Sequence, residues 1–377
     1  MEPVKVYPSG LGGPECPDLA AVYKHPGPFV TCYFDMHAPA EDVARRAEIR
    51  WEDLRRELQA QDVAWRTIES VARSLSGAGD LRQKAESACV VASEGEVLLV
   101  EGGPTSLGHD FVTLGQLPAL GPLLGWRQQA ITYVTVLCDL AGADIVLHGH
   151  GEDRVLLGGE RDRHDPLLHK AHTGGWSYPR YERRVENTWA RNAKDVIDVL
   201  DHLVVREHPR VVMFGGEPHA CGLLRQDASP TLRPLLHELP LSRADGAREH
   251  DSPAVRAAVE ALVAGDTARL VDHFREMKAK SLGAEGAGPV LAALTAAQVA
   301  TVLLHEYPDD ERTAYMSLDP VAASLDRVEV AASGGEPFAA RLVDVALAAT
   351  FLTGAGARMV PEPPAEQGIA ALLRFPG

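Results

Sequence analysis

Two hydrophobic patterns alternate along the chain and predict its secondary structure. Short runs of aromatic and β-branched residues bounded by turn residues predict strands. Longer charged segments with apolar residues at helical spacing predict helices. Residues 1–27 are rich in Pro and Gly and are expected to be extended, and residues 102–126 are expected to be a connection. Between them the predicted elements are a strand at 29–34, helices at 40–60 and 62–75, and a hairpin of strands 88–92 and 96–101.

The middle of the chain predicts a mixed α/β layer. A strand at 131–139 is followed by a turn and a return strand at 144–148, and a long helix begins near Pro179. Residues 210–216 form an apolar run that ends in two glycines, which is typical of a strand buried between helices. Strands that alternate with helices in this way indicate an α/β fold. The remaining predicted elements of this layer are a helix at 219–225 and a strand at 235–241.

The last third continues the alternation. Gly265-Asp266-Thr267 is expected to separate two helices. Pro337 is expected to lie in the first turn of a long apolar helix, where its missing N–H has no cost. The predicted helices are 254–263, 268–280, 288–294 and 336–352, and the predicted strands are 301–305, 357–360 and 368–375.

Length and composition indicate a folded protein of several domains. A chain of 377 residues is too long for one ordinary core, and the patterns divide it at 1–127, 128–261 and 262–377. A hydrophobic share of 45% with a charged share of 24% is typical of a soluble globular protein. No apolar run approaches the roughly 18 residues of a membrane span, and the first residues lack signal-peptide features. We therefore expect a cytoplasmic protein without membrane contact.

The cysteines indicate no disulfide framework. They are odd in number and far apart in the sequence, and no pair has the spacing of a metal site or a redox motif. We therefore expect reduced thiols, as in most cytoplasmic proteins. The five residues are Cys16, Cys32, Cys89, Cys138 and Cys221.

A basic segment interrupts an acidic chain. The net charge of −16 argues against indiscriminate binding of nucleic acid. Residues 161–194 nevertheless contain eight Lys or Arg against four Asp or Glu, a local net charge of about +4. A reversal of sign of this size predicts contact with a polyanion. The alternative is a solvated surface loop.

The predicted helix that follows has two faces. Arg180, Arg184 and Arg191 are four and seven positions apart and share one stripe, which suits the phosphates of RNA. The other face is apolar and is expected to pack on the sheet, so its tryptophan is interpreted as a core residue. The residues of this face are Val185, Trp189, Val196, Leu200 and Leu203.

The loop before this helix resembles a motif of the class I release factors of archaea and eukaryotes. Those factors carry Gly-Gly-Gln, then Ser-Ala-x-Arg-Phe-x-Arg and a long helix. Here Gly174-Gly175-Trp176 is followed by Ser177-Tyr178-Pro179-Arg180-Tyr181-Glu182-Arg183. The strands at 131–139 and 211–216 extend the match, and residues 290–304 resemble the helix-then-strand signature of the C-terminal domain of release factors and Pelota. The whole layout resembles the bacterial archaeo-eukaryotic release factor family, whose actinobacterial branch is related to the ribosome hibernation factor Balon.

This resemblance implies a fold and a set of partners. It implies a mixed α/β N-terminal domain, a ribonuclease H-like middle domain and a ribosomal-protein-like α/β/α C-terminal domain. In such a protein the first domain reaches the decoding centre of the 70S ribosome, and the loop of the middle domain reaches the peptidyl-transferase centre. Elongation factor Tu is the expected partner of the third domain, and no cofactor is expected.

The chain departs from the release-factor motif at Trp176. In the hydrolytic factors the glutamine helps to place the water that attacks peptidyl-tRNA, and the glycines let the backbone approach closely. An indole has one N–H donor and no acceptor, so it cannot position a water as an amide does, whereas it can stack on an exposed base. We therefore expect a hibernation or stress factor that occupies the ribosomal A site and has no catalytic residue. Its expected RNA-binding residues are Lys170, His172, Gly174, Gly175, Trp176, Ser177, Arg180, Arg183, Arg184 and Arg191.

Two other functions stay open at this point. The loop could use another residue for hydrolysis, which would make the chain a peptidyl-tRNA hydrolase or a ribosome-rescue release factor. Alternatively, the chain could be a non-ribosomal RNA-binding stress protein that has kept only the fold.

Several other patterns favour structural roles. Asp139 and Asp144 flank a hairpin where ribonuclease H-like folds hold metal, but no further acids follow at suitable places, so both are interpreted as turn acids. The histidines of the basic segment have no cysteine nearby, so no metal site is expected. Gly215-Gly216 lacks the lysine of a Walker motif, and Ser177 with His172 lacks a nucleophile-elbow sequence.

Overall fold

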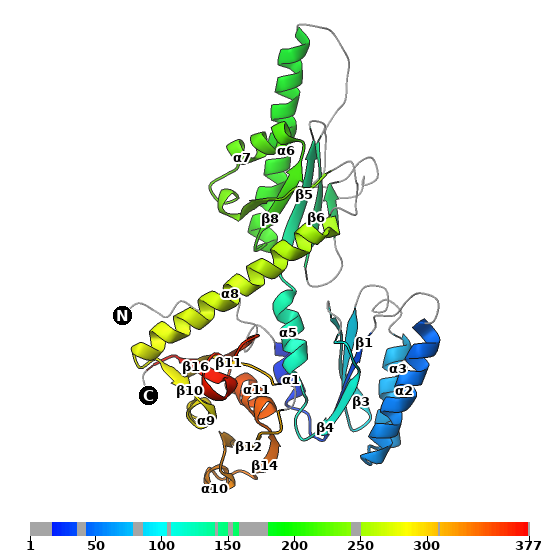
Figure 1. The fold of residues 1–377 in the computed structure, drawn as a ribbon, viewed down its shortest axis with the longest axis vertical. Helices are drawn as coiled ribbons and strands as arrows, with labels where there is room; N and C mark the ends of the chain where they lie inside the picture. The colour runs from blue at the N-terminus through cyan, green and yellow to red at the C-terminus, as the bar shows by residue number, and fades with distance from the viewer. Residues whose placement is uncertain are drawn as a thin grey trace. The chain divides into compact units, whose positions relative to one another are not determined.

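The structure of the chain is a computed structural model that separates into two compact units. Unit 1 consists of residues 1–129 and 265–377, and unit 2 consists of residues 130–264. Figure 1 shows the helices and strands of both units. None of the described helices combines the length and the apolar character needed to cross a membrane. The structure describes residues 17–35, 43–77, 86–103, 107–139, 142–149, 154–157, 180–242, 250–307 and 310–375.

The N-terminal part of unit 1 is an antiparallel sheet with helices on both faces. Its elements are α1 (Pro17–Val22), β1 (Phe29–Asp35), α2 (Val43–Ala60), α3 (Trp65–Gly77), β2 (Ser87–Ser93), β3 (Glu96–Gly103), β4 (Phe111–Gly115) and α5 (Gly121–Gln129). The strand order is β3-β2-β1-β4. β1 and β2 are buried along their whole length because α2 and α3 cover one face and a second apolar cluster covers the other.

The C-terminal part of unit 1 contains two smaller sheets. Its elements are β10 (Gly283–Glu285), α9 (Ala287–Thr295), β11 (Val299–Leu304), β12 (Thr313–Leu318), β13 (Val321–Ser324), α10 (Arg327–Ala332), β14 (Phe338–Arg341), α11 (Leu342–Leu352), β15 (Gly356–Met359) and β16 (Ile369–Leu373). One sheet has the order β10-β16-β11-β15 and the other β13-β12-β14. α11 is apolar on almost every side and nearly all of its residues are buried, which marks it as the central helix of this part.

The two parts of unit 1 share one apolar core. Tyr33 of β1 lies in the same buried cluster as Leu291 of α9. Tyr23, just after α1, stacks on Phe351 of α11 with 5.8 Å between the ring centroids. Residues 1–129 and 265–377 are therefore packed as one compact unit, and the predicted division of these segments into two separate domains stays a prediction.

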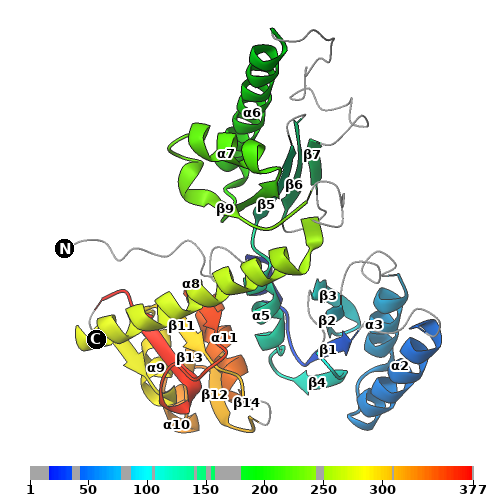
Figure 2. The same cartoon turned by 45° about the horizontal axis from the view of Figure 1, so that its top comes forward.

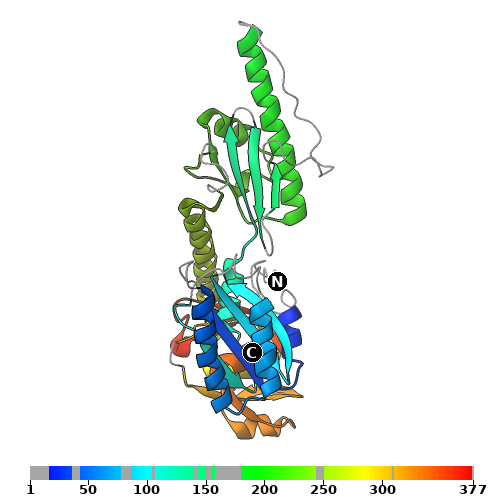
Figure 3. The same cartoon turned by 90° about the vertical axis from the view of Figure 1, so that its right-hand side faces the viewer.

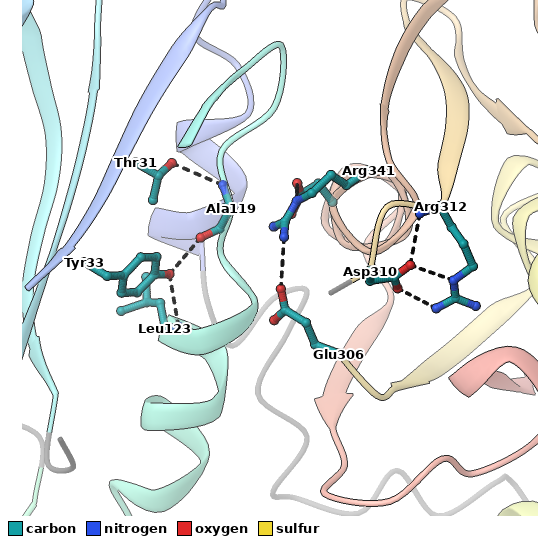
Figure 4. A network of polar contacts seen from close by, with 9 residues as sticks. Thr31, Tyr33, Ala119, Leu123, Glu306, Asp310, Arg312 and Arg341 are labelled. Carbon is teal, nitrogen blue, oxygen red and sulfur yellow. Dashed lines mark hydrogen bonds and ion pairs between the residues drawn. The ribbon is translucent and has the colours of Figure 1, made fainter. Parts of the chain in front are cut away.

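Polar contacts of two β1 side chains hold the segment that leads into α5 (Figure 4). The hydroxyl of Tyr33 donates to the C=O of Ala119 at 2.7 Å and accepts from the N–H of Leu123 at 3.2 Å. The N–H of Ala119 donates to the hydroxyl oxygen of Thr31 at 3.2 Å. These bonds satisfy backbone groups at the start of a helix that would otherwise be buried without partners.

A group of acids and arginines lies in the C-terminal part of unit 1 (Figure 4). Arg341 pairs with Glu306 at 3.3 Å, and Arg312 pairs with Asp310 at 2.5 Å. The Glu306 carboxylate lies so close to Gly121 that a Cβ at that position would collide with it. The N-terminal residue of α5 is therefore packed directly against this charged group.

Unit 2 is a five-stranded mixed sheet with helices on both faces (Figures 2 and 3). Its elements are β5 (Tyr133–Asp139), β6 (Gly142–His148), β7 (Arg154–Leu157), α6 (Arg180–Glu207), β8 (Val212–Gly216), α7 (Pro218–Asp227), β9 (Leu236–Glu238) and α8 (Pro253–Ala279), which runs on into unit 1. The strand order is β7-β6-β5-β8-β9, with β6 antiparallel to its neighbours and β5, β8 and β9 parallel. α6 and α7 cover one face, and the start of α8 covers the other.

Most predicted elements occur near their expected positions, and the mixed α/β class is confirmed. Residues 102–126 are not only a connection, because they contain β4 and most of α5. The sequence did not predict α5, because its first residues, Gly121-Pro122, are typical of a loop. Proline is nevertheless well tolerated in the first turn of a helix. Residues 17–22 likewise form α1 rather than extended chain.

Two predictions about helices were wrong. α8 is one helix that continues through Gly265. A glycine inside a helix costs only about 1 kcal/mol, and the helix has buried anchors on both sides of it, Val255 and Phe274. Residues 338–341 form β14 instead of the first turn of a helix, because Phe338 pairs with Met316 of β12, and α11 begins after this strand.

Candidate functional site

The predicted RNA-binding segment immediately precedes α6 and includes its first turns. The structure describes the backbone of α6 from its first residue, but not the side chains of its first turns. The RNA-contact assignments therefore stay predictions. The predicted residues outside the described part are Lys170, His172, Gly174, Gly175, Trp176 and Ser177, together with the side chains of Arg180, Arg183, Arg184 and Arg191.

The C-terminal half of α6 fixes the helix to the sheet. Val196, Leu200 and Leu203 are buried as predicted, in a cluster with apolar residues of β5 and β8. The side chain of Trp189 lies outside the described part, so its role as a core residue stays a prediction. Successive positions of a helix are rotated by about 100°, so the backbone places positions 180, 184 and 191 on one common side. Figures 1 and 3 show the N-terminal turns of α6 extending beyond the sheet of unit 2.

A pocket of about 540 Å³ lies in unit 2 at the carboxyl ends of β5 and β8. These strands are adjacent and parallel, so their carboxyl ends meet at one edge of the sheet. Ligands of α/β proteins commonly bind at such an edge. The lining residues are Cys138, Asp139, Asp144, Gly216, Glu217, Leu241 and Ser242.

Three acidic side chains line this pocket. Only Asp139 and Asp144 were candidates from the sequence. The third, Glu217, is the N-cap of α7, where its carboxylate accepts a hydrogen bond from the N–H of Ala220 at 2.8 Å. Its sequence signal was its place directly before Pro218, an order typical of a helix start. Across the described part of the chain, no three His, Cys, Asp or Glu side chains are arranged to hold a metal ion together.

Gly215 and Gly216 allow backbone segments to approach one another at this edge. Gly216 has φ 130°, and a Cβ on it would collide with the C=O of Cys138. A Cβ on Gly215 would collide with the C=O of Leu239. The N–H of Glu217 also donates to the C=O of Cys138 at 2.9 Å. Close packing of the strand ends therefore accounts for the glycine pair without a bound nucleotide.

Two cysteines meet beside the pocket. The sulfur of Cys138 in β5 lies 3.5 Å from that of Cys221 in α7. The hydrogen bond with Cys221, together with burial, raises the pKa of Cys138, and the same hydrogen bond lowers the pKa of Cys221. All four cysteines in the described part of the chain are free thiols, as the sequence predicted. Their spacing in the sequence gave no sign that two of them would be neighbours.

Comparison with known proteins identifies the relatives of this segment. Residues 132–280 match the model of Bacterial archaeo-eukaryotic release factor family 2. This segment is related to that release-factor family. The matched residues include the sheet of unit 2, α6, α7 and α8, so the pocket and the predicted RNA-binding segment both lie inside the match. The resemblance of this segment to the bacterial archaeo-eukaryotic release factors is thereby confirmed, and the relation to the Balon branch stays a prediction.

The matches among solved structures include translation factors at low identity. An archaeal translation termination factor, aRF1, is 19% identical, with 95% of this chain and 98% of that chain covered and a TM-score of 0.26. Pelota of Archaeoglobus fulgidus is 13% identical, with coverages of 76% and 79% and a TM-score of 0.37. A model of ribosome-bound archaeal Pelota and ABCE1 is 13% identical, with coverages of 100% and 99% and a TM-score of 0.38. No curated protein matches the chain.

Proposed function

We propose that the chain is a ribosome-associated factor that occupies the A site and the peptidyl-transferase region without releasing the nascent peptide. The observation that carries this proposal is the family match over residues 132–280, the segment that contains Gly174-Gly175-Trp176. Release factors that hydrolyse peptidyl-tRNA have glutamine where this chain has Trp176. The indole has no acceptor with which to orient a water, so the loop keeps a contact surface and loses the group that supports the chemistry.

The proposal assigns a role to each part of the chain. Residues 1–127 would reach the decoding centre, and residues 128–261 would form a ribonuclease H-like middle domain. The strand order β7-β6-β5-β8-β9, with three antiparallel strands followed by two parallel ones, supports that middle-domain assignment. Residues 262–377 would form the ribosomal-protein-like domain that contacts elongation factor Tu. The outcome, as in the Balon-related branch of the family, would be an idle ribosome protected during stress in the cytoplasm.

Charge supports a localised contact with ribosomal RNA. The net charge of the chain is −16, so the chain as a whole is expected to repel phosphate, whereas residues 161–194 carry about +4. α6 gives positions 180, 184 and 191 a common side. Three cationic side chains in such a row can follow a phosphate backbone, and their contribution to affinity must fall as salt rises.

Sedimentation with 70S ribosomes tests binding. The chain should co-sediment at low salt, and Arg180→Ala/Arg184→Ala should weaken binding and reduce the slope of log affinity against log salt by about 1 for each lost phosphate contact. The matched control is Arg256→Ala/Arg275→Ala, which removes the same charge from exposed positions of α8. The proposal fails if the chain stays in the supernatant at low salt, or if the control pair weakens binding equally. Binding to free RNA but not to ribosomes would instead support a non-ribosomal RNA-binding protein.

A peptide-release assay tests the absence of catalysis. Ribosomes loaded with peptidyl-tRNA should keep their peptide when the natural chain is added, at a rate equal to that with buffer. Trp176→Gln restores the amide of the hydrolytic factors but removes the stacking indole, so this variant should bind ribosomes more weakly than the natural chain. Rapid release by the natural chain would identify it as a peptidyl-tRNA hydrolase or rescue factor.

A further inference from the structure

The thiols of Cys138 and Cys221 lie next to each other in unit 2, and their chemistry does not depend on ribosome binding. Cys138 is the sixth residue of β5, and Cys221 lies in the first half of α7. Both side chains are buried, with exposed fractions of 5% and 3%, and their sulfurs are 3.5 Å apart. The thiol of Cys138 also donates to the C=O of Gly215 at 3.2 Å. The two sulfurs are therefore held together from distant parts of the sequence.

We propose that Cys138 and Cys221 are the site of a reversible intrachain disulfide that forms when the chain meets a hydroperoxide. A disulfide requires sulfurs about 2.05 Å apart, so the pair must close by about 1.5 Å, a movement that two side chains can share. Cys138 also lines the pocket at the ends of β5 and β8. That pocket has a volume of about 540 Å³, so a molecule as small as hydrogen peroxide fits in it next to Cys138, whose sulfur lies 3.5 Å from that of Cys221.

The other two described cysteines show what such a pair requires. Cys32 and Cys89 lie on adjacent strands, but they belong to apolar clusters on opposite faces of the sheet. Each is completely buried, and burial raises the pKa of Cys89 to about 12. Since neither faces a second sulfur and both thiols resist ionisation, they provide an internal control for the pair in unit 2.

The chemistry requires one peroxide for each bond. We assign the attacking thiolate to Cys221, because the sulfur of Cys138 lies 3.5 Å away and the hydrogen bond between them lowers the pKa of Cys221. Its sulfur attacks one peroxide oxygen, the O–O bond breaks, and the products are a sulfenic acid on Cys221 and hydroxide, which takes up the proton that the thiol had lost. The sulfur of Cys138 then attacks that of Cys221 and the S–O bond breaks. The leaving hydroxide takes up the proton of the Cys138 thiol and becomes water. Two thiols are oxidised and one peroxide is reduced to two waters.

The disulfide would tie the start of α7 to the end of β5. It would join positions 138 and 221, and closing a loop of this length limits the unfolded chain strongly. α7 packs against α6, the helix that carries the predicted RNA-binding arginines, so the bond would stabilise the support of that helix. The oxidised chain should therefore unfold at a higher temperature than the reduced chain, and a dithiol reductant should reverse the shift.

Non-reducing peptide mapping of the full chain after treatment with hydrogen peroxide tests the proposal. One cross-linked peptide pair containing positions 138 and 221 should appear, with the loss of two of the five thiols and of the mass of two hydrogen atoms. The melting temperature should rise by several degrees and return after dithiothreitol. The proposal is overturned if both thiols stay reduced while exposed thiols of an added peptide are oxidised, or if Cys138 and Cys221 link to other cysteines.

Single variants test the order of the steps. Cys138→Ser should stop the reaction at a sulfenic acid on Cys221, which dimedone labels, whereas Cys221→Ser should give neither the label nor the cross-link. Cys32→Ser and Cys89→Ser should leave the cross-link of the natural chain intact. A dimedone label on Cys138 in the Cys221→Ser chain would overturn Cys221 as the attacking thiolate. Because the mapping of the natural chain needs no variant, a variant that fails to fold does not decide the outcome.

Discussion

The guanidinium of Arg341 donates to both carboxylate oxygens of Asp344, at 2.7 and 2.9 Å. Asp344 is nevertheless only 5% exposed, and burial outweighs the arginine, so that its pKa is raised to about 7. Burial also raises the pKa of Glu306, the second acid beside Arg341. Between pH 3.8 and about 7 the folded chain therefore keeps a proton on Asp344 that the unfolded chain has lost. The unfolded state binds fewer protons over this range, so the contribution of Asp344 to stability falls as pH rises through it.

The first prediction concerns Asp344→Asn, which removes this titration. The substitution should cost less stability at pH 8 than at pH 5, by roughly 2–3 kcal/mol, because the natural residue is penalised at the higher pH and asparagine is not. Urea unfolding at both pH values measures the difference. Asp272→Asn is the control, since Asp272 is an exposed partner of Arg275 and its cost should change little with pH. The same cost of Asp344→Asn at both pH values would mean that the carboxyl of the folded chain is already ionised at pH 5.

Gly216 and Gly222 predict opposite effects of the same substitution. Gly216→Ala adds a Cβ that collides with the C=O of Cys138, at a residue whose φ of 130° side chains rarely adopt. It should destabilise unit 2 by about 3 kcal/mol or more. Gly222 lies inside α7 with open space around a Cβ, so Gly222→Ala should stabilise by about 0.5–1 kcal/mol. Thermal unfolding of both variants checks the pair, and similar effects of the two substitutions would contradict this geometry.

Gln128 is predicted to be important for the packing of α5 against β15. Its side-chain amide donates to the C=O of Met359 at 2.8 Å and accepts from the N–H of Met359 at 2.6 Å. Gln128→Ala would leave two backbone groups at a buried site without these bonds, which should cost about 2–4 kcal/mol. Gln129 is the next residue of α5 and is exposed, so Gln129→Ala should cost less than about 0.5 kcal/mol. Urea unfolding compares them, and equal costs would show that the amide is replaced by water.

The parts of the fold that the sequence predicted best are those where local pattern and burial agree. β5 and β8 are continuous apolar runs that end in polar or glycine residues, and both were found within two residues of their bounds. Prediction failed where contacts distant in sequence decide the outcome. Phe338 became a strand residue because Met316 pairs with it. Gly265 did not end a helix because apolar residues on each side of it are buried.

In the candidate site, too, features that are local in the sequence were predicted, and features that depend on distant contacts were not. The Gly174-Gly175-Trp176 motif and its family were readable because they are contiguous in sequence. The pocket and the thiol pair were not, because they depend on the parallel pairing of β5 with β8, which brings Glu217 and Cys221 to the end of a strand far earlier in the chain. No spacing rule for cysteines or acids covers a separation of this kind.

The last prediction tests how α6 is held. Leu200 is fully buried among apolar residues of the sheet, whereas Val205 of the same helix is 69% exposed. Leu200→Ala removes buried methyl groups and leaves a cavity, so it should cost about 2–5 kcal/mol, and Val205→Ala should cost less than about 0.5 kcal/mol. Urea unfolding of both variants measures the costs. The predicted RNA-binding positions 180, 184 and 191 lie on the same helix. Leu200→Ala should therefore also weaken ribosome co-sedimentation under conditions in which a large part of this variant is unfolded, and Val205→Ala should not weaken it under the same conditions. Equal stability of the two variants would mean that this face of α6 does not anchor the helix, and the support proposed for the RNA-binding segment would have to lie elsewhere.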